Sequence, residues 1–507
     1  MTQESTAPLA QVPAVVEPPQ GPSEALIEFM SQGWAAAEPT DPIPSDGVAS
    51  LAQHREALSR RFPGEWLVVP TGGLKVRAND TDYRFRPGSD FAWLTGYHEP
   101  DAVLVMAPVA GGHESVLYAT PRSDRSGPGF FTDFRYGELW VGPRMGLEEA
   151  SVVLGIRTAE LSDLAGALKA SEGDRVRVLR GMAGEVDALV APASNPDGPS
   201  AEPNGTTALD GQGDGVAASD AQPDIELALA LAELRLIKDG YEIGCLQAAA
   251  DSTAIAFEDV VRSLDQAQSH SERWVEGTFN RRARTEGNDI GYETIAACGA
   301  HACTLHWTRN DGPVRPGSLL LLDAGVEGPE LYTADVTRTI PVSGRFDPAQ
   351  RDVYEAVWRA QRAGLDQCRP GNNFMDPHRA AMAVLAEWLV ERGILTCSTE
   401  DALDEENRWY VRYTLHGTSH MLGLDVHDCG AARNEHRNLE LAPGMVITVE
   451  PGCYLQPDDL SVPPQYRGIG VRIEDDVVIT ENGHIVLSSS LPTAPNDVEA
   501  WMAGLRG

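Results

Sequence analysis

Short apolar segments that begin or end at an acidic residue recur through the C-terminal half of the chain. Four such segments are Leu319–Leu322 before Asp323, Val336–Ile340 after Asp335, Met445–Val449 before Glu450, and Ile469–Ile473 before Glu474. Apolar runs of this length, bounded by turn residues, are typical of buried strands. The pattern therefore predicts strands that each present a carboxylate at one end, with Asp323 and Asp335 meeting across a hairpin.

The same patterning predicts further elements and the limits of the domains. It predicts strands over Trp66–Val69, Ala102–Ala107 and Val116–Ala119, and helices over Glu24–Met30, Ile225–Leu236 and Glu242–Leu264. Residues 1–45 hold eight prolines and no basic residue, and residues 190–224 hold six acids and no base. Such segments do not bury enough apolar surface to fold alone. We expect a flexible arm over 1–48, an N-terminal α/β domain over 49–189, a disordered acidic linker or insertion over 190–224, and a catalytic domain over 225–507.

Three histidines, His416, His420 and His427, fall within twelve residues. His416 and His420 are four positions apart, a spacing that would place them on one face of a helix. Gly417 and Gly423 weaken a helix at this point, so a strand or a loop is equally open.

Five residues are candidate metal ligands: Asp323, Asp335, His420, Glu450 and Glu474. Four carboxylates in one interior site would repel each other and lose solvation, unless cations compensated their charge. Two divalent cations would offset four ionised carboxylates. Oxygen-dominated ligation with one imidazole and no thiolate suits manganese, cobalt, zinc or iron(II). Metal-assisted hydrolysis is therefore the first functional hypothesis.

The ligand segments resemble a known family. They are similar, in type and order, to the five ligand motifs of the pita-bread metallopeptidases: Leu322-Asp323-Ala324-Gly325, Asp335-Val336-Thr337-Arg338-Thr339, His416-Gly417-Thr418-Ser419-His420, Val449-Glu450-Pro451-Gly452 and Arg472-Ile473-Glu474-Asp475-Asp476. In the N-terminal half, Arg86-Pro87-Gly88-Ser89-Asp90-Phe91 and Leu94-Thr95-Gly96-Tyr97 resemble the N-terminal domain of aminopeptidase P, the Xaa-Pro aminopeptidase. The resemblance implies an α/β (α+β) architecture, with an N-terminal α/β domain followed by a C-terminal pita-bread catalytic domain.

The resemblance also implies a role for each site residue. Asp323 would bind one metal ion, Asp335 and Glu474 would bind both, and His420 and Glu450 would complete the other, with manganese the expected metal. Glu450 would also take the proton of the attacking water, and His306 and His427 would bond the substrate and stabilise the tetrahedral intermediate. His416, Tyr454 and Arg472 would line the pocket for the substrate proline, and Trp140 would reach an active site, either its own or that of a neighbouring subunit. No comparable context surrounds His301, His378 or His436, which we expect at the surface.

Three functions are compatible with these motifs. The leading one is an Xaa-Pro aminopeptidase, which removes an N-terminal residue that precedes proline. We expect the enzyme to form a homo-oligomer, either a dimer or a tetramer. A prolidase, which is restricted to Xaa-Pro dipeptides, would share the ligands and the pocket. A non-catalytic binding protein on the same fold is the third, but such relatives typically lose ligands, and all five are present here.

Composition changes this interpretation little. The 507 residues are enough for two domains, and a formal charge of −35 with only three lysines disfavours nucleic acid or an anionic membrane as a partner. No segment reaches the length of a membrane span. The first 54 residues contain no Lys or Arg, so we expect no signal peptide and a cytoplasmic location. Seven cysteines without a CxxC pair predict buried thiols, not disulfides or a zinc site.

Overall fold

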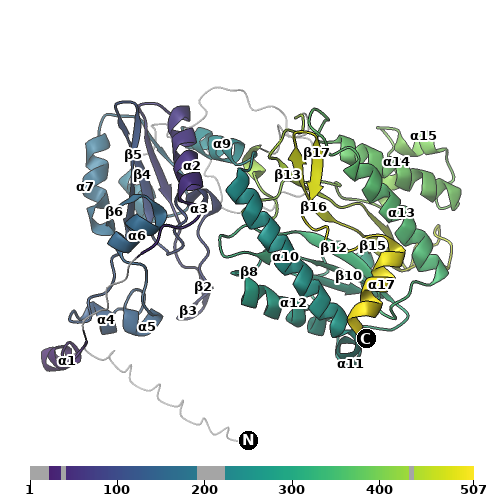
Figure 1. The fold of residues 1–507 in the computed structure, drawn as a ribbon, viewed down its shortest axis with the longest axis horizontal. Helices are drawn as coiled ribbons and strands as arrows, with labels where there is room; N and C mark the ends of the chain where they lie inside the picture. Colours follow the sequence, from purple (N-terminus) through teal and green to yellow (C-terminus); the bar gives the residue numbers. More distant parts are fainter. Residues whose placement is uncertain (1–21, 36–41, 191–222, 433–438, 507) are drawn as a thin grey trace, which may run out of the picture.

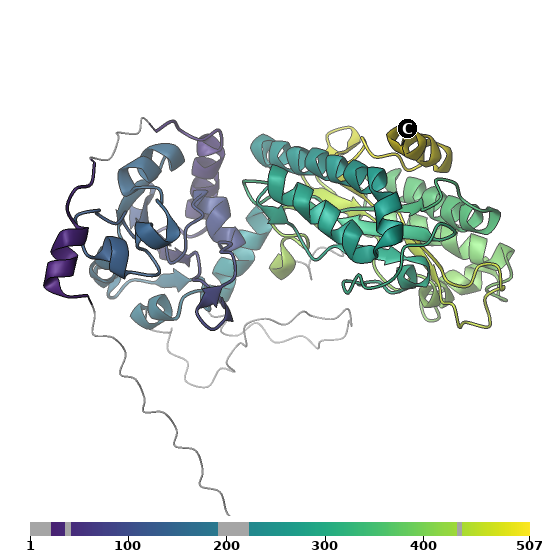
Figure 2. The same cartoon turned by 90° about the horizontal axis from the view of Figure 1, so that it is seen from below.

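The computed structural model describes residues 22–35, 42–190, 223–432 and 439–506. Figure 1 shows two domains side by side, an N-terminal domain built on one sheet and a C-terminal domain in which several small sheets lie among longer helices. The view turned by 90° shows the same separation (Figure 2). Much of the predicted arm and nearly all of the predicted linker lie outside the described residues, as does His436. The helix expected over Glu24–Met30 is confirmed as α1 (Glu24–Met30).

One mixed sheet forms the centre of the N-terminal domain. Its strands are β1 (Trp66–Pro70), β4 (Val103–Val109), β5 (Gly112–Ala119), β6 (Arg157–Glu160) and β7 (Val176–Val178), in the order β6-β5-β4-β1-β7. β4 pairs antiparallel with β1 and β5, whereas β6 and β7 pair parallel with their neighbours. The three strands predicted here are confirmed as β1, β4 and β5. β5 begins four residues earlier than expected. Its first half is polar and not fully buried, so the apolar pattern did not identify it, and it belongs to the strand because it pairs with β4.

Both faces of this sheet are covered. Leu67 packs toward Leu58 on one face, and the next residue, Val68, packs toward Leu164 on the other, as the alternation of side chains along a strand requires. The covering helices are α2 (Val48–Arg61), α3 (Ser89–Thr95), α6 (Leu147–Leu154) and α7 (Leu164–Leu168). Smaller elements complete the domain, namely β2 (Val76–Ala78), β3 (Thr81–Asp82), α4 (Gly129–Thr132), α5 (Glu138–Val141) and α8 (Gly184–Leu189).

Short strands in the C-terminal domain form the sheets β12-β10-β9, β13-β16-β17, β14-β15 and β11-β8. Their bounds are β8 (Asp289–Ile290), β9 (Ile295–Cys298), β10 (Leu319–Ala324), β11 (Val326–Glu327), β12 (Val336–Pro341), β13 (Val446–Val449), β14 (Gly452–Leu455), β15 (Ile469–Arg472), β16 (Asp475–Thr480) and β17 (Gly483–Val486). β10 and β12 pair antiparallel in continuous register from Leu319 opposite Pro341 to Ala324 opposite Val336. The predicted strand pair is therefore confirmed.

Two pairs of helices enclose these strands, with α10 packed on α12 and α13 packed on α14 (Figure 1). The helices are α9 (Pro223–Leu234), α10 (Gly240–Arg262), α11 (Leu264–Ser269), α12 (Glu272–Glu286), α13 (Pro348–Leu365), α14 (Asp376–Glu391), α15 (Thr399–Leu403) and α17 (Pro495–Arg506). α9 and α10 confirm the two predicted helices. Both end two residues earlier than predicted, and the C-cap of α10 is Ser263, whose N–H donates to the carbonyls of Asp259 and Val260. No helix in the described part of the chain is long and apolar enough to cross a membrane.

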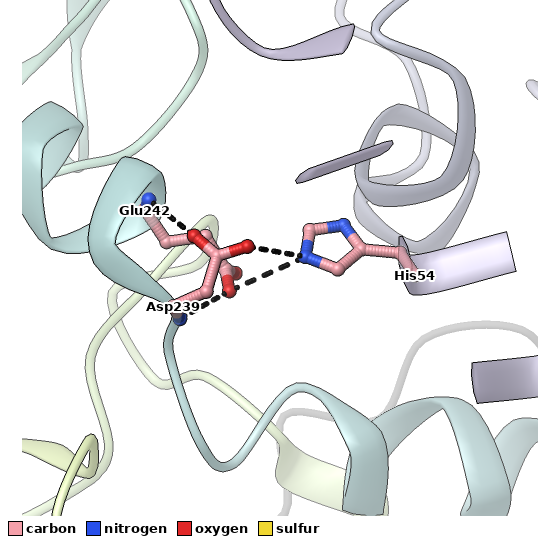
Figure 3. A group of neighbouring side chains, drawn as sticks. All are labelled: His54, Asp239 and Glu242. Atoms are coloured by element: carbon pink, nitrogen blue, oxygen red, sulfur yellow. Dashed lines mark hydrogen bonds and ion pairs between the residues drawn. The ribbon is translucent and has the colours of Figure 1, made fainter. Parts of the chain in front are cut away.

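A histidine of the N-terminal domain docks on the first turn of α10 (Figure 3). His54 Nε2 lies 3.2 Å from Asp239 Oδ2 and 3.5 Å from Glu242 Oε2, and its Nδ1 lies 2.9 Å from the carbonyl oxygen of Trp93. Asp239 and Glu242 already cap α10, and their remaining acceptor positions bond Ser50, Trp93 and Tyr332. The group is thus a satisfied ion pair between the domains and leaves no oxygen free for a cation.

We expect this ion pair to make stability fall as pH rises. Burial alone would lower the pKa of His54, but its bonds to Asp239 and Glu242 raise that pKa to about 9. The stabilisation is fully present below the ordinary pKa of about 6.5 and is lost as pH rises through about 9, with an upper limit of about 3 kcal/mol. Denaturant unfolding of the wild type and of His54→Gln at several pH values from 6 to 10 measures it. The difference between the two should shrink with pH, and a difference that does not change would contradict the assignment.

Candidate metal centre and active site

Asp323 and Asp335 lie at the same end of the β10–β12 pair. Asp323 is the fifth residue of β10, and Asp335 immediately precedes β12. The hydroxyl of Tyr292 lies 2.7 Å from Asp323 Oδ1 and 2.5 Å from Asp335 Oδ1, so the two carboxylates share its proton. Both side chains are buried. The structure thus brings together the two carboxylates that the sequence predicted to meet.

Steric contact explains why the residue at position 325 is glycine. A Cβ atom at Gly325 would lie 1.7 Å from the carbonyl oxygen of Ala334, closer than any side chain allows. The chain leaving β10 therefore approaches the segment before Asp335 at a distance that only glycine permits. This close approach positions the two carboxylates side by side.

Glu474 reaches the same place from the junction of β15 and β16. Its backbone N–H donates to the Thr337 carbonyl over 3.1 Å, and the Thr337 hydroxyl donates to Glu474 Oε2 over 2.6 Å. A guanidinium nitrogen of Arg338 donates to the Glu474 carbonyl over 2.6 Å. Because Thr337 and Arg338 belong to β12, the strand that follows Asp335 also fixes Glu474.

His420 and Glu450 complete the cluster. Residues 416–420 form a loop, which settles the alternatives of helix, strand and loop. The Thr448 N–H of β13 donates to the His420 carbonyl, and the His420 N–H donates to the Thr448 hydroxyl. His420 Nε2 lies 3.3 Å from Asp335 Oδ2 and 3.5 Å from Glu450 Oε1. Glu450 follows β13, and its N–H donates to the Thr418 carbonyl over 2.8 Å. Donor atoms of Asp335, His420 and Glu474 all lie within 4.8 Å of one another.

The charges in this cluster are unbalanced. Burial raises the pKa of Glu450 to about 7, with Asp335 and Asp323 adding to the shift and His420 opposing it. Burial and the neighbouring acids also raise the pKa of Glu474 well above its ordinary value. Burial would lower the pKa of His420, but Asp335 and Glu450 raise it to about 9. The protein alone therefore holds protons in a site whose carboxylates would be ionised if cations replaced those protons.

A chain of hydrogen bonds joins the predicted proline pocket to Asp323. His416 Nε2 lies 2.7 Å from the Tyr454 hydroxyl, and Arg472 donates to that hydroxyl over 2.7 Å and to Asp323 Oδ2 over 2.5 Å. His416 Nδ1 lies 3.4 Å from Glu450 Oε2. Burial lowers the pKa of His416 to about 3, so its ring is neutral at physiological pH. The three residues predicted to line a pocket thus form one connected group beside the ligands.

The remaining predicted residues lie at different distances from this group. The ring of His427 is exposed and packs edge-on against that of His420, with ring centroids 4.5 Å apart. His306 is also exposed and lies close enough to His416 to contribute to its lowered pKa. Trp140 lies on α5, beside α4 at the far end of the N-terminal domain (Figure 1). The structure does not bring Trp140 to the site of its own chain.

Both domains of the chain match known protein families. The family model for Metallopeptidase family M24 matches residues 244–481, and that for Aminopeptidase P, N-terminal domain, matches residues 51–177. Xaa-Pro aminopeptidase 1 of Streptomyces coelicolor is 50% identical over 490 residues, which cover 96% of this chain and 94% of that protein. The chain belongs to metallopeptidase family M24.

Solved structures share this architecture over about nine tenths of the chain. Aminopeptidase P from E. coli aligns with a TM-score of 0.76 at 30% identity, covering 90% of this chain and 98% of that one. Proline aminopeptidase P II from Yersinia pestis aligns with a TM-score of 0.75 at 31% identity, covering 90% and 99%. The predicted family and the predicted order of an N-terminal α/β domain and a pita-bread domain are confirmed.

The residues of this M24 site fit divalent cations. The donors are carboxylates and one imidazole, with Asp323, Asp335 and Glu474 buried and Glu450 half-buried. The raised pKa values of Glu450 and Glu474 agree with a site that has too little positive charge of its own. A metallopeptidase of this family uses divalent metal, and the donor set agrees with that chemistry. The predicted metal dependence is therefore confirmed at the level of a divalent ion.

Sequence reasoning missed several residues of the M24 site. Tyr292, which bonds both aspartates, comes from an irregular segment between β8 and β9 with no recognisable motif. His378 on α14 was expected at the surface but is half-buried, 3.0 Å from the Thr418 hydroxyl, and it lowers the pKa of His416. His301, also expected at the surface, is half-buried too, but it bonds Glu272 over 2.8 Å and contacts none of the predicted ligands among the bonds described. Only the packing of distant segments could have identified them.

Proposed function

We propose that the chain is an Xaa-Pro aminopeptidase that uses two divalent metal ions to release an N-terminal residue preceding proline. The observation that carries the proposal is the bond chain from His416 through Tyr454 and Arg472 to Asp323, because it ties a pocket of flat side chains to a predicted metal ligand. The Xaa-Pro aminopeptidases 1 and 2 of Streptomyces coelicolor, which are 50% and 48% identical to this chain, support the same reaction.

In this proposal five residues hold the metal ions: Asp323, Asp335, His420, Glu450 and Glu474. Manganese is the expected metal, because hard carboxylate oxygens outnumber nitrogen and no thiolate takes part. The bound ions would lower the pKa of water and polarise the scissile carbonyl.

Glu450 is the residue we assign to proton transfer. Its two oxygens face different partners, with Oε1 toward His420 and Oε2 toward His416. One carboxylate therefore contacts both a predicted ligand and the predicted substrate pocket. That position is the one from which a base can take a proton from water and deliver it to the departing amine.

The pocket is suited to proline for a physical reason. The nitrogen of an Xaa-Pro bond carries no hydrogen, so no acceptor in the site can receive a hydrogen bond from it. A neutral imidazole at His416 and the phenol of Tyr454 offer flat surfaces against which a pyrrolidine ring can pack. His306 and His427 are assigned to the substrate carbonyl and the tetrahedral intermediate.

We also propose that Trp140 serves the site of a second copy in a dimer or tetramer. Four large apolar side chains on or beside α5 are exposed, namely Phe134, Leu139, Trp140 and Val141. The ring of Trp140 packs on Phe134 with centroids 4.1 Å apart, and its N–H donates to the Phe131 carbonyl, so the exposed group is held in place. A fixed exposed apolar group of this kind is typical of a protein interface.

Hydrolysis of matched peptides tests the reaction. Manganese-loaded protein should cleave Ala-Pro-Ala, should cleave Ala-Ala-Ala far more slowly, and should lose activity in a chelator. Cleavage of Ala-Ala-Ala in preference to Ala-Pro-Ala would contradict the specificity. Cleavage of Ala-Pro alone would assign the chain as a prolidase, and no cleavage of any of the three would favour a binding protein.

A further inference from the structure

The turn between His420 and His427 is held tightly within the catalytic domain. Its first residue, Gly423, has no room for a side chain, since a Cβ atom there would lie 2.3 Å from Asp428 Oδ2. At the other end, the N–H of Asp428 donates to the Met421 carbonyl over 2.9 Å. The same carbonyl oxygen lies 3.1 Å from His420 Nδ1. One backbone oxygen thus connects a predicted metal ligand to the residue after His427.

Two side chains of the N-terminal domain bond this turn directly. Arg86 donates to the Leu424 carbonyl over 2.5 Å, and the Ser89 hydroxyl donates to Asp425 Oδ1 over 2.6 Å. Arg86 also donates to the Ser89 hydroxyl over 3.1 Å and to Glu327 Oε2 over 2.6 Å. Because Glu327 lies on β11, just after Gly325, Arg86 connects the turn to the chain that leaves β10.

The opposite side of the turn is held by buried cations. Arg235 bonds Asp425 Oδ2 over 3.0 Å, Asp428, and Asp90 of the N-terminal domain over 2.8 Å. Lys238 donates to Asp428 Oδ2 over 2.8 Å. Both carboxylates that flank His427 are therefore held by hydrogen bonds. Asp425 is bonded by Ser89 of the N-terminal domain and by Arg235, and Asp428 is bonded by Arg235 and Lys238 of the catalytic domain.

The position of His427 follows from these contacts. Its exposed ring extends from a backbone that is fixed two residues before and one residue after it, and lies beside the His420 ring. Loss of the contacts to Leu424 and Asp425 would free the turn on the side of the N-terminal domain. An error of about 1 Å in the position of a reacting group can cost about 10²-fold in rate.

We infer that Arg86 and Ser89 are positioning residues of the N-terminal domain, which fix the turn at residues 423–428 and so hold His427 at the active site. The inference rests on the proposed function, in which His427 bonds the substrate. It also gives a physical role to the Arg86-Pro87-Gly88-Ser89-Asp90 motif, which sequence alone left without one. Arg86 and Ser89 act only through the turn, and neither needs to contact substrate.

A matched control lies two residues away. Arg84 also joins the two domains, through Asp289, but it does not contact the turn. Arg84→Ala removes an interdomain ion pair that is more exposed than the one between Arg86 and Glu327, and it reports the effect of losing a domain contact away from the turn. Ser89→Thr retains the hydroxyl and serves as the conservative variant for Ser89→Ala.

The experiment compares these variants as metal-loaded proteins on Ala-Pro-Ala. We expect Arg86→Ala and Ser89→Ala to lower kcat about 10-fold to 100-fold with KM and metal content unchanged, Ser89→Thr to recover most of the loss, and Arg84→Ala to stay within about two-fold of the wild type. In a double-mutant cycle, Arg86→Ala should cost little once His427→Ala is present, because the group that it positions is gone. Additive losses, or equal losses in Arg84→Ala and Ser89→Ala, would overturn the inference.

Hydrogen exchange keeps this test separate from the proposed function. In Arg86→Ala and Ser89→Ala, the amides of Gly423 and Asp428 should exchange faster than in Arg84→Ala. If the wild type cleaves no Xaa-Pro peptide, the proposed function fails, and the exchange result still judges the positioning. Unchanged exchange at both amides would refute it, and Ser89→Ala gives the answer should Arg86→Ala not fold.

Discussion

Glu474→Ala is expected to lose bound metal and peptidase activity together. Glu474 is almost completely buried, and burial with Asp335, Glu450 and Asp323 nearby raises its pKa, so its carboxylate is unfavourable without cations. In the proposed site Glu474 would be one of the residues that hold the metal ions, and its removal would take away a charged ligand. We expect activity to fall by more than about 10³-fold, beyond the loss of a single transition-state donor. Metal analysis of the purified variant, beside Ala-Pro-Ala hydrolysis, measures both effects.

Two further variants separate loss of a ligand from loss of the fold. Glu474→Gln keeps the volume and removes the charge, so the chelator-treated variant should unfold at or above the temperature of chelator-treated wild type while still lacking metal. Glu481→Ala changes an exposed acid seven residues away and should leave metal and activity unchanged. Full metal occupancy in Glu474→Gln would show that Glu474 is not a required ligand.

Much of the fold could be predicted because the local pattern and the tertiary environment agree. Leu319–Leu322 is continuously apolar and is buried on all sides, so a simple apolar run was enough to identify β10. β5 shows the limit of the method. Its first half is polar and half-buried, and its conformation depends on pairing with β4. The local sequence of β5 carries no information about that pairing.

The residues predicted as ligands could be picked out from the sequence, whereas the residues that support them could not. Each ligand lies within a short motif whose residue types reflect local needs, such as the close approach at Gly325. Tyr292 and His378 reach the site from segments that only tertiary packing places beside it. The same holds for Arg86 and Ser89, which contact residues more than three hundred positions away. Sequence patterns report local constraints, and these contacts are not local.

Removing a predicted ligand and removing an exposed histidine would have different effects on the charge of the site. Asp335 and Glu450 contact His420 in a cluster of four carboxylates, so loss of an acid changes the positive charge that the site can hold. His427 contributes an exposed ring that contacts the His420 ring by its edge. In the proposed function this difference separates residues assigned to metal binding from residues assigned to the substrate, and metal content is the measurement that distinguishes the two roles.

His427→Ala is expected to keep its metal while turnover falls about 10²-fold to 10³-fold, the usual cost of one lost donor to a transition state. The ring of His427 packs beside that of His420, but His427 is not one of the five predicted ligands. The bonds described above that fix Glu474 and His420 come from other residues. Metal content, KM and kcat on Ala-Pro-Ala measure the result, with His270→Ala, a histidine of the surface near α12, as the control that should behave as wild type. Loss of metal from His427→Ala would instead make it a ligand or a necessary support of His420. An unchanged kcat would remove His427 from the reaction altogether, and with it the reason for Arg86 and Ser89 to hold its turn.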